Sequence, residues 1–241
     1  MRLGIWQLDR LSQRRALNAM LSARLASSPV PVRELLHDSV AGAYRRVTAT
    51  GTYDFANEMS LAARTHQGSP GVNIITPLRL TGTDTAILVN RGWVYSPDAE
   101  RVDFGRWLEP TQATVTGYLL QPGRGGRGAA SSPGNPRVIR RLDHDSVTKR
   151  LPYPIADFVL VVTGDAQRTT GTSATRDSTP ARLTLPLMDE GPHLGYAIQW
   201  FSFALIALVG GAVGVRLDRG GSYHAQRVAM RSTNESERHH G

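Results

Sequence analysis

Residues 193–215 read HLGYAIQWFSFALIALVGGAVGV, and this stretch decides what kind of chain the sequence encodes. Residues 191–215 contain no formally charged side chain when His193 is taken as neutral. As a helix, residues 193–215 would be about 35 Å long at ~1.5 Å per residue, enough to cross a hydrocarbon core of about 30 Å. Tyr196 and Trp200 lie near one end, where membrane proteins place aromatic residues. The sequence therefore predicts a C-terminal transmembrane helix at 191–215 rather than the buried helix of a soluble protein.

Basic residues are distributed unequally on the two sides of this span. The arginines that follow it are Arg216, Arg219, Arg227, Arg231 and Arg238. The fifteen residues before Gly191 carry only Arg176 and Arg182. Because cytoplasmic flanks are enriched in Lys and Arg, the tail 216–241 is predicted to be cytoplasmic and the preceding domain extracytoplasmic. The expected location is the inner membrane of a bacterial cell.

The first 190 residues divide into a helical segment and a β-rich region. Leucines at helical spacing alternate with arginines over residues 1–25, which predicts an amphipathic helix within the N-terminal segment 1–28. Residues 29–190 show short runs of β-branched and aromatic residues separated by turns. The expected strands are 44–54, 72–80, 85–94, 113–120, 136–142, 158–163 and 182–187, with a short helix at 143–150. This pattern predicts a mainly β domain, an antiparallel barrel or sandwich.

Two polar stretches interrupt the β-rich region. Residues 122–136 read PGRGGRGAASSPGNP, and residues 165–180 read DAQRTTGTSATRDSTP. Segments of this composition cannot bury enough apolar surface to offset the entropy lost on ordering. We therefore predict disordered surface loops at both places.

The composition excludes several classes of function. The net charge of +8 suggests nucleic-acid binding, but 27 of the 28 basic residues are arginines and Lys149 is the only lysine, which indicates GC-rich bacterial coding. The arginines are scattered and form no basic helix with interleaved aromatics, so we predict no nucleic-acid partner. The sequence has no cysteine, which excludes disulfides, thiolate zinc sites, iron–sulfur clusters and cysteine-based copper carriage.

Four separated segments carry recognisable motifs. They are residues 3–10 (LGIWQLDR), 44–54 (YRRVTATGTYD), 75–94, which includes NRGWV, and 193–201 (HLGYAIQWF). In order and spacing they resemble the surfeit locus protein 1 family over nearly the whole chain. The resemblance implies two transmembrane helices flanking a domain outside the cytoplasm. It also implies a role in assembling haem–copper terminal oxidases such as cytochrome c oxidase, by handling haem a for insertion into the catalytic subunit.

The resemblance also raises an expectation about the N-terminus. In the family the LGxWQxxR segment lies at the outer end of the first transmembrane helix, and that helix is missing from this sequence. We therefore expect the reading frame to extend upstream of Met1 by about 20 mostly apolar residues.

His193 is the candidate ligand for haem iron, because imidazole is a common axial ligand. Helical spacing places it on one face with Tyr196, Trp200 and Phe203. Smaller residues continue that face as Ala207, Gly210 and Gly214. In one interpretation haem a lies against the aromatic half, and the small half packs on a partner helix. In the other, the aromatic residues only anchor the helix at the membrane interface.

Residues 90–93 read NRGW and end a predicted strand. Arg91 is expected to pair with a carboxylate because its planar guanidinium fits one. That carboxylate is either a haem propionate or a structural side chain such as Asp54. Gly92 is expected to mark a bulge or a tight bend, and Trp93 to lie in the core.

The motifs of common enzymes are missing from the sequence. It contains no Gly-rich phosphate loop, no GxSxG elbow and no HExxH. The missing motifs give no indication of an enzyme, and the family resemblance implies a membrane-anchored assembly factor, which is the predicted function. Its expected partners are the oxidase catalytic subunit, the haem a synthesis machinery and the lipid bilayer. The alternatives are a structural module that contacts the oxidase without binding haem, and an extracytoplasmic enzyme.

Overall fold

The structure is a computed structural model that describes residues 2–36, 39–123, 131–132, 134–164, 179–186 and 188–237. For residues 39–40, 215 and 217–237 it describes the backbone alone. The chain separates into two compact units: Met1–Ala19 with Met188–Gly241, and Met20–Leu187.

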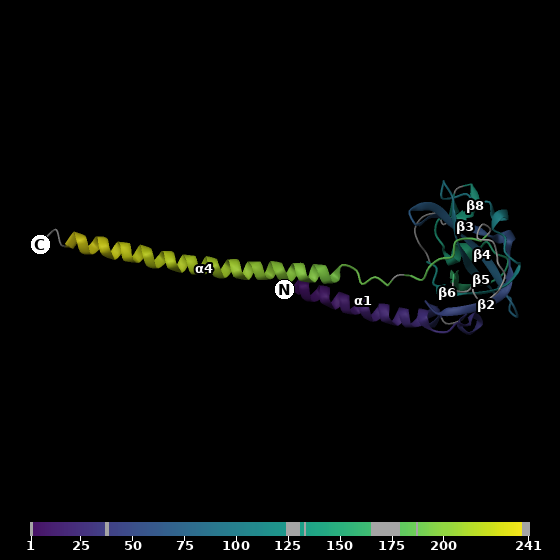
Figure 1. The fold of residues 1–241 in the computed structure, drawn as a ribbon, viewed down its shortest axis with the longest axis horizontal. Coiled ribbons are helices and arrows are strands. Elements are labelled where there is room, and N and C mark those ends of the chain that lie inside the picture. Colours follow the sequence, from purple (N-terminus) through teal and green to yellow (C-terminus); the bar gives the residue numbers. More distant parts are fainter. Residues whose placement is uncertain are drawn as a thin grey trace. The chain divides into compact units, whose positions relative to one another are not determined.

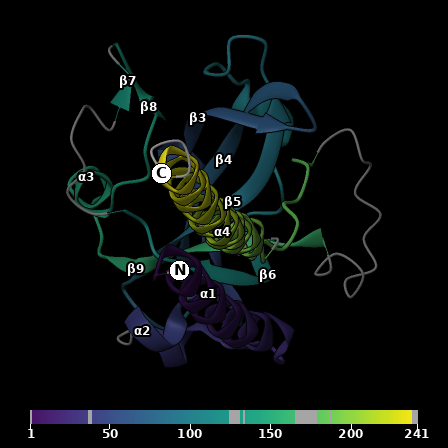
Figure 2. The same ribbon diagram turned by 90° about the vertical axis from the view of Figure 1, so that its left-hand side faces the viewer.

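The unit formed by residues 20–187 is built around one sheet. Its strands are β1 (Val30–Pro31), β2 (Arg46–Tyr53), β3 (Met59–His66), β4 (Ser69–Leu80), β5 (Ala86–Tyr95), β6 (Gln112–Leu120), β7 (Ser131–Ser132), β8 (Asn135–Ile139) and β9 (Ile155–Val162). They pair in the order β1-β2-β6-β9-β5-β4-β3-β8-β7, and β2 also pairs with β4. This additional pairing links β2, β6, β9, β5 and β4 into a closed ring of hydrogen-bonded strands. Figure 2 shows β7 and β8 together beside β3.

The mainly β prediction is confirmed; most strand pairs are antiparallel, as expected, but the sheet is mixed. The pairs β1–β2, β3–β8 and β5–β9 are parallel. Parallel neighbours need long connections rather than hairpins. The connection from β5 to β9 meets that need by including β6, β7, β8 and the short helix α3 (His144–Thr148).

The main core is formed by residues from all five strands of this ring, and β2 shows the alternation of buried and more exposed residues that is expected of a strand with one buried face. Every second residue of β2 is buried, beginning with Val47. In contrast, β9 reads IADFVLVV and is buried along nearly its whole length, as expected for a strand covered on both faces. The main cluster of buried residues includes Val47, Ala49, Tyr53, Leu78, Ile87, Val89, Leu119, Phe158 and Leu160.

The NRGW sequence forms a β-bulge in β5. Ile74 of β4 pairs with Gly92, and Ile75 pairs with Asn90, so Arg91 is the extra residue. Gly92 has φ +133°, a backbone conformation that residues with a Cβ atom rarely adopt. The bulge predicted at Gly92 is confirmed. Trp93 was expected in the core, but it is only half-buried. Its indole N–H donates to the Arg64 carbonyl at 3.3 Å.

Several other predictions need correction. Strand β3 was not predicted, because its regular pairing is interrupted between Leu61 and Arg64 and its alternation is weak. Residues 182–187 were predicted as a strand, but among the described residues 182–186 only Leu183 forms a bridge, next to the bridge of Ala181 just before the predicted strand. The stretch 122–136, predicted to be disordered, contains β7 and the start of β8, while 124–130 and 133 lie outside the described residues. Of the second predicted loop, 165–180, residues 165–178 also lie outside the described residues.

The helices are α1 (Arg2–Ala26), α2 (Ser39–Gly42), α3 and α4 (His193–Glu237), with 3-10 turns at Val32–Leu35, Phe55–Asn57 and Phe104–Trp107. The predicted N-terminal helix and the short helix within 143–150 are confirmed. Helix α4 begins near the expected residue but continues beyond 215 (Figure 1). Within the described residues, His193–Gly214 is the one helical stretch long and apolar enough to cross a membrane, with a mean hydropathy of 1.7.

We predict that Gly92→Ala destabilises the chain more than Gly82→Ala. Both glycines have positive φ, +133° and +79°, so alanine would be strained at either by about 1–3 kcal/mol. A Cβ on Gly92 would also lie 2.4 Å from the Ala181 carbonyl oxygen, whereas at Gly82 it would meet no described atom within 4 Å. Urea unfolding of the full chain in detergent would measure both losses. Equal losses would show that the Ala181 backbone can move aside without cost.

Candidate functional site

The first turns of α1 pack against the first turns of α4 within one compact unit. A Cβ on Gly4 would lie 2.8 Å from the ring of Phe201, so the two helices approach closely at that point. Leu11 of α1 and Ala197 of α4 are buried, although most of their neighbours are exposed. Small residues at a contact allow such close approach of two helical backbones. The two motifs LGIWQLDR and HLGYAIQWF, from opposite ends of the sequence, therefore meet here.

A hydrogen bond joins the two motifs. The Nδ1 atom of His193 lies 2.9 Å from Oε1 of Gln7, and both side chains are half-buried. An amide oxygen can only accept a hydrogen bond, so in this arrangement Nδ1 carries the proton. The neutral imidazole then keeps the lone pair of Nε2 for another partner. Sequence reasoning missed Gln7 although it lies inside a quoted motif, because nothing in the sequence indicates a contact between residues 186 positions apart.

Gly191 lies beside the outer edge of the same imidazole. A Cβ on Gly191 would be 3.5 Å from Nε2 of His193, and Gly191 has φ +72°. A methyl group at this position would be in van der Waals contact with the Cδ2–Nε2 edge of the ring. Glycine therefore both permits the backbone turn before α4 and keeps that edge of the ring clear of a methyl group.

Polar contacts hold the segment that precedes α4 against α1. Both guanidinium groups involved belong to α1: Arg15 forms two hydrogen bonds with Glu190, at 3.0 and 2.9 Å, and Arg14 donates to the Asp189 carbonyl at 3.3 Å. Asn18 donates to the same carbonyl at 3.1 Å. Hydrogen bonding from Arg15 lowers the pKa of Glu190. The polar residues of the two segments thus lie next to each other, just beyond the contact of Gln7 with His193.

The aromatic residues predicted to share a face with His193 are largely exposed in the described chain. Tyr196 is 48% exposed and Trp200 39%, and Trp200 meets Phe203 edge to face at 6.0 Å between ring centroids. Helix α1 covers a neighbouring face instead, formed by His193, Ala197 and Phe201. Among the described residues nothing lies within 4 Å of a Cβ placed on Gly210 or Gly214. The aromatic part of the predicted face is therefore partly exposed, and its glycines have no neighbour within 4 Å among the described residues.

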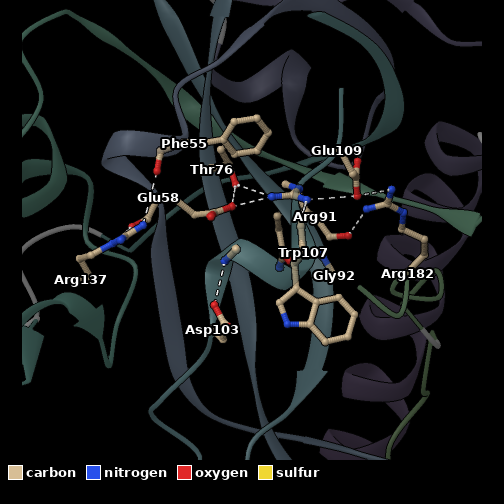
Figure 3. Close-up of polar contacts among 12 residues, drawn as sticks. Phe55, Glu58, Thr76, Arg91, Gly92, Asp103, Trp107, Glu109, Arg137 and Arg182 are labelled. Carbon is tan, nitrogen blue, oxygen red and sulfur yellow. Dashed lines mark hydrogen bonds and ion pairs between the residues drawn. The ribbon is translucent and has the colours of Figure 1, made fainter. Parts of the chain in front are cut away.

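Arg91 lies in the other unit, at the centre of a buried polar network (Figure 3). Its side chain is 0% exposed, and its Nη1 donates to Oε1 of Glu58 at 2.5 Å. Its Nη2 lies 3.3 Å from Oε1 of Glu109 and also donates to the Trp107 carbonyl. The guanidinium additionally lies over the ring of Phe55, at 5.3 Å from the centroid. The Arg91 guanidinium, which is shielded from solvent, is thus surrounded by groups that compensate its charge.

A second arginine extends the network toward the chain segment 179–186. Arg182 donates to Glu109 at 2.9 Å and to the Arg91 carbonyl. Next to it, Ala181 forms two backbone hydrogen bonds with Trp93, both of 2.8 Å. The network fastens this segment to the bulged end of β5. From the sequence, Arg182 was predicted to lie in a strand, and no local pattern indicated that Glu58 or Glu109 would pair with an arginine.

Burial also shifts the pKa values of side chains in and beside the network. Burial raises the pKa of Glu58, although a hydrogen bond from the Thr76 hydroxyl and the charge of Arg91 act in the opposite direction. The Oε2 atom of Glu58 and the hydroxyl of Tyr53 are buried, and neither has a hydrogen-bond partner among the described residues. Burial raises the pKa of Tyr53 as well.

The geometry favours the structural alternative for Arg91 and corrects its partner. The expected carboxylate, Asp54, instead accepts hydrogen bonds from Tyr153 at 2.6 Å and Asn57 at 2.8 Å. The carboxylates beside Arg91 are Glu58 and Glu109. Because the Arg91 side chain has no exposed surface, a haem propionate could reach it only if this network opened. Among the described residues no group of three His, Asp or Glu side chains could hold a metal ion.

Comparison with known proteins identifies the relatives of this chain. Residues 1–205 match the SURF1 family. The chain belongs to the SURF1 family. A SURF1-like protein of Drosophila melanogaster is 31% identical over 218 residues, which cover 84% of this chain and 69% of the relative. A SURF1-like protein of Mycobacterium tuberculosis is 27% identical over 214 residues, 86% of this chain and 74% of the relative. The cytochrome oxidase assembly protein SHY1 of Saccharomyces cerevisiae is 30% identical over 94 residues, 38% of this chain and 24% of SHY1.

We predict that Arg91→Met lowers the free energy of unfolding by about 3–5 kcal/mol or abolishes folding, because it leaves Glu58 buried without its counter-ion. Adding Glu58→Gln should recover part of the loss, since the uncompensated charge is then removed. The control is Arg101→Met, which breaks an exposed ion pair with Asp98 at 3.6 Å and should change stability very little. Urea unfolding would measure all three. A loss at Arg91 no larger than that at Arg101 would contradict a structural role for the network.

Proposed function

We propose that this SURF1 family member is a membrane-anchored assembly factor for a haem–copper terminal oxidase, and that it holds haem a through His193 for delivery to the catalytic subunit. The family assignment supports the assembly role, as does the similarity to a yeast protein named for cytochrome oxidase assembly. The apolar stretch His193–Gly214 supports membrane anchoring. The observation that carries the haem-binding part is the contact of Gln7 with Nδ1 of His193.

The residues around His193 fit a haem group. With Nδ1 bound to Gln7, Nε2 has the lone pair that an iron ligand requires. The absence of a side chain at Gly191 keeps space beside Nε2. Tyr196 and Trp200, on the same helical face as His193, offer exposed rings against which a flat macrocycle can pack. When bound, haem a supplies the redox-active iron that the oxidase requires, and no bond of the cofactor needs to be made or broken by this chain.

The chain's own residues would bind, orient and release rather than catalyse. His193 would hold the iron and the aromatic rings would shield one side of the macrocycle from water. A single side chain ligand and an open face are suited to transient binding, because few contacts must be broken on transfer. This interpretation also explains why the sequence carries no recognisable catalytic motif. The haem a synthesis machinery is then the source, and the oxidase catalytic subunit the recipient.

The alternative is a structural module that contacts the oxidase without touching haem. The open seam of Ala207, Gly210 and Gly214 favours it, because such a seam suits a helix of a partner protein. The two functions differ in one observable respect. A structural module would be recovered with the oxidase but would be colourless when haem is abundant.

The proposed orientation has the β-rich unit outside the cytoplasm and the tail that follows the span inside. The arginines after residue 215 support it, since positive flanks stay in the cytoplasm. In this orientation His193 is at the outer surface of a bacterial inner membrane.

We predict that His193→Ala abolishes or shifts the haem absorption of the protein purified after co-expression with haem a synthesis. Membrane insertion should remain intact, because alanine suits a membrane helix. Trp200→Ala should weaken haem retention without changing the ligand-dependent spectrum, because it removes only packing area. His66→Ala, which removes an imidazole from the β-rich unit, is the control and should leave the spectrum unchanged. A wild-type protein that never carries haem under these conditions would favour the structural module.

We predict the topology from reporter fusions. A reporter that is active only in the periplasm should work when inserted within residues 125–128 and fail when fused after Arg231, because the basic tail stays in the cytoplasm. Activity should be assayed in a strain that produces the full-length protein. The opposite pattern would overturn the proposed orientation.

A further inference from the structure

We infer that Gln7 is a positioning residue that fixes the tautomer and the ring orientation of His193, so that the LGIWQLDR motif completes an iron ligand supplied by the other end of the chain. This inference rests on the proposed haem-binding function and adds to it a residue with a defined role. It follows from one contact, of 2.9 Å between Gln7 Oε1 and His193 Nδ1, and from the helix packing that holds the contact in place.

The chemistry of the contact specifies where the imidazole proton must be. Oε1 of Gln7 has no hydrogen to donate, so Nδ1 donates, and in the neutral form of the ring Nε2 is then the nitrogen with the free lone pair. Only an unprotonated ring nitrogen can bind iron. If the amide were turned so that its NH₂ group faced Nδ1, the proton would move to Nε2 and the ligand would be lost. A hydrogen bond on the second nitrogen also makes the first more basic, which is the usual arrangement around histidines that bind metals.

The packing on either side of Gln7 keeps its side chain directed at His193. Gly4, one turn before it, contacts Phe201, and Leu11, one turn after it, is buried. Because residues 4, 7 and 11 lie on one face of a helix, Gln7 necessarily points toward α4. The bidentate pair of Arg15 with Glu190 secures the same segments further along. The tautomer of His193 therefore depends on the pairing of the two helices and would be lost if they separated.

The inference makes a prediction for the protein without haem. In the ¹⁵N-labelled full chain in detergent micelles, the imidazole of His193 should be protonated on Nδ1 at neutral pH, and its signals are assigned by their loss in His193→Ala. Gln7→Met, which keeps length and helix propensity but removes the acceptor, should lose the predominance of that form. Gln7→Glu retains an acceptor oxygen and should restore it. A wild-type chain protonated on Nε2 would overturn the inference.

The second readout is the haem-loaded protein after co-expression with haem a synthesis. Gln7→Met should retain haem about 10–100-fold less well, the usual effect of removing a partner of a metal-ligating histidine. Gln7→Glu should retain it, with a more negative reduction potential because a carboxylate makes the imidazole a stronger donor. Gln13→Met is the matched control: Gln13 is an exposed residue of the same helix, and its replacement should change neither readout.

The outcomes separate the inference from the function on which it rests. If Gln7→Met keeps the affinity, spectrum and potential of the wild type, the positioning role is wrong although haem binding stands. If the wild type shows the Nδ1-protonated form but takes up no haem a, the proposed haem-binding function is wrong. Loss of haem in Gln7→Met together with rescue by Gln7→Glu supports the inference, because a merely structural role would not distinguish an acceptor from a thioether of similar size.

Discussion

A guanidinium group removed from water is the constraint on which the β-rich unit depends. Arg91 has no exposed surface, and a buried cation without partners would be strongly destabilising. The fold therefore brings Glu58, which precedes β3, and Glu109, which precedes β6, to its two sides, and Arg182 closes on Glu109 from the segment 179–186. The bulge makes this possible, since the extra residue in β5 interrupts the pairing with β4 and changes the direction of the side chain. One local irregularity thus joins segments that are distant in the sequence, including the one that leads toward α4.

The helical unit depends on a comparable match of polar groups at the edge of an apolar surface. Between residues 194 and 214 of α4 the exposed side chains are almost all apolar, whereas Asp189 and Glu190 before the helix are charged. In the first half of helix α1 the order is opposite: the exposed apolar residues Leu3, Ile5, Trp6 and Leu8 come before Asp9, and the charged residues Arg10, Arg14 and Arg15 come after it, although Leu17 and Met20 further along are also exposed. The contact of Gln7 with His193 lies close to the point where, in both segments, exposed apolar residues give way to charged ones. In the proposed membrane orientation this level would correspond to the interface, where half-buried polar groups find both protein partners and water.

The sequence predicted those parts of the structure that depend on periodicity, and not those that depend on a distant partner. The helix at 2–26, the apolar stretch of α4 and most strands follow from local spacing. Strand β3 was missed because its pairing is broken at Leu61–Arg64, and the parallel pairs were missed because register between distant strands leaves no local signal. Among the candidate residues, His193, Tyr196 and Trp200 of the helical unit and Arg91 of the β-rich unit were singled out by residue type and by the family resemblance. Their partners Gln7, Glu58, Glu109 and Arg182 were not, since each is defined only by what it touches.

Exposed aromatic residues on α4 do not by themselves require a bound ligand. Tyr and Trp are common where hydrocarbon meets the headgroups, because an apolar ring and a polar atom suit the two sides of that boundary. A seam of small residues is likewise explained by helix packing alone. The imidazole of His193 is different, because its Nδ1 is bound by Gln7 and the residue beside its Nε2 is a glycine. A histidine that only anchors a helix needs one hydrogen bond and no particular tautomer, whereas an iron ligand needs both nitrogens specified. This geometry is the basis of the proposed ligand role of His193, in which one terminal motif would supply the donor nitrogen and the other would set its proton.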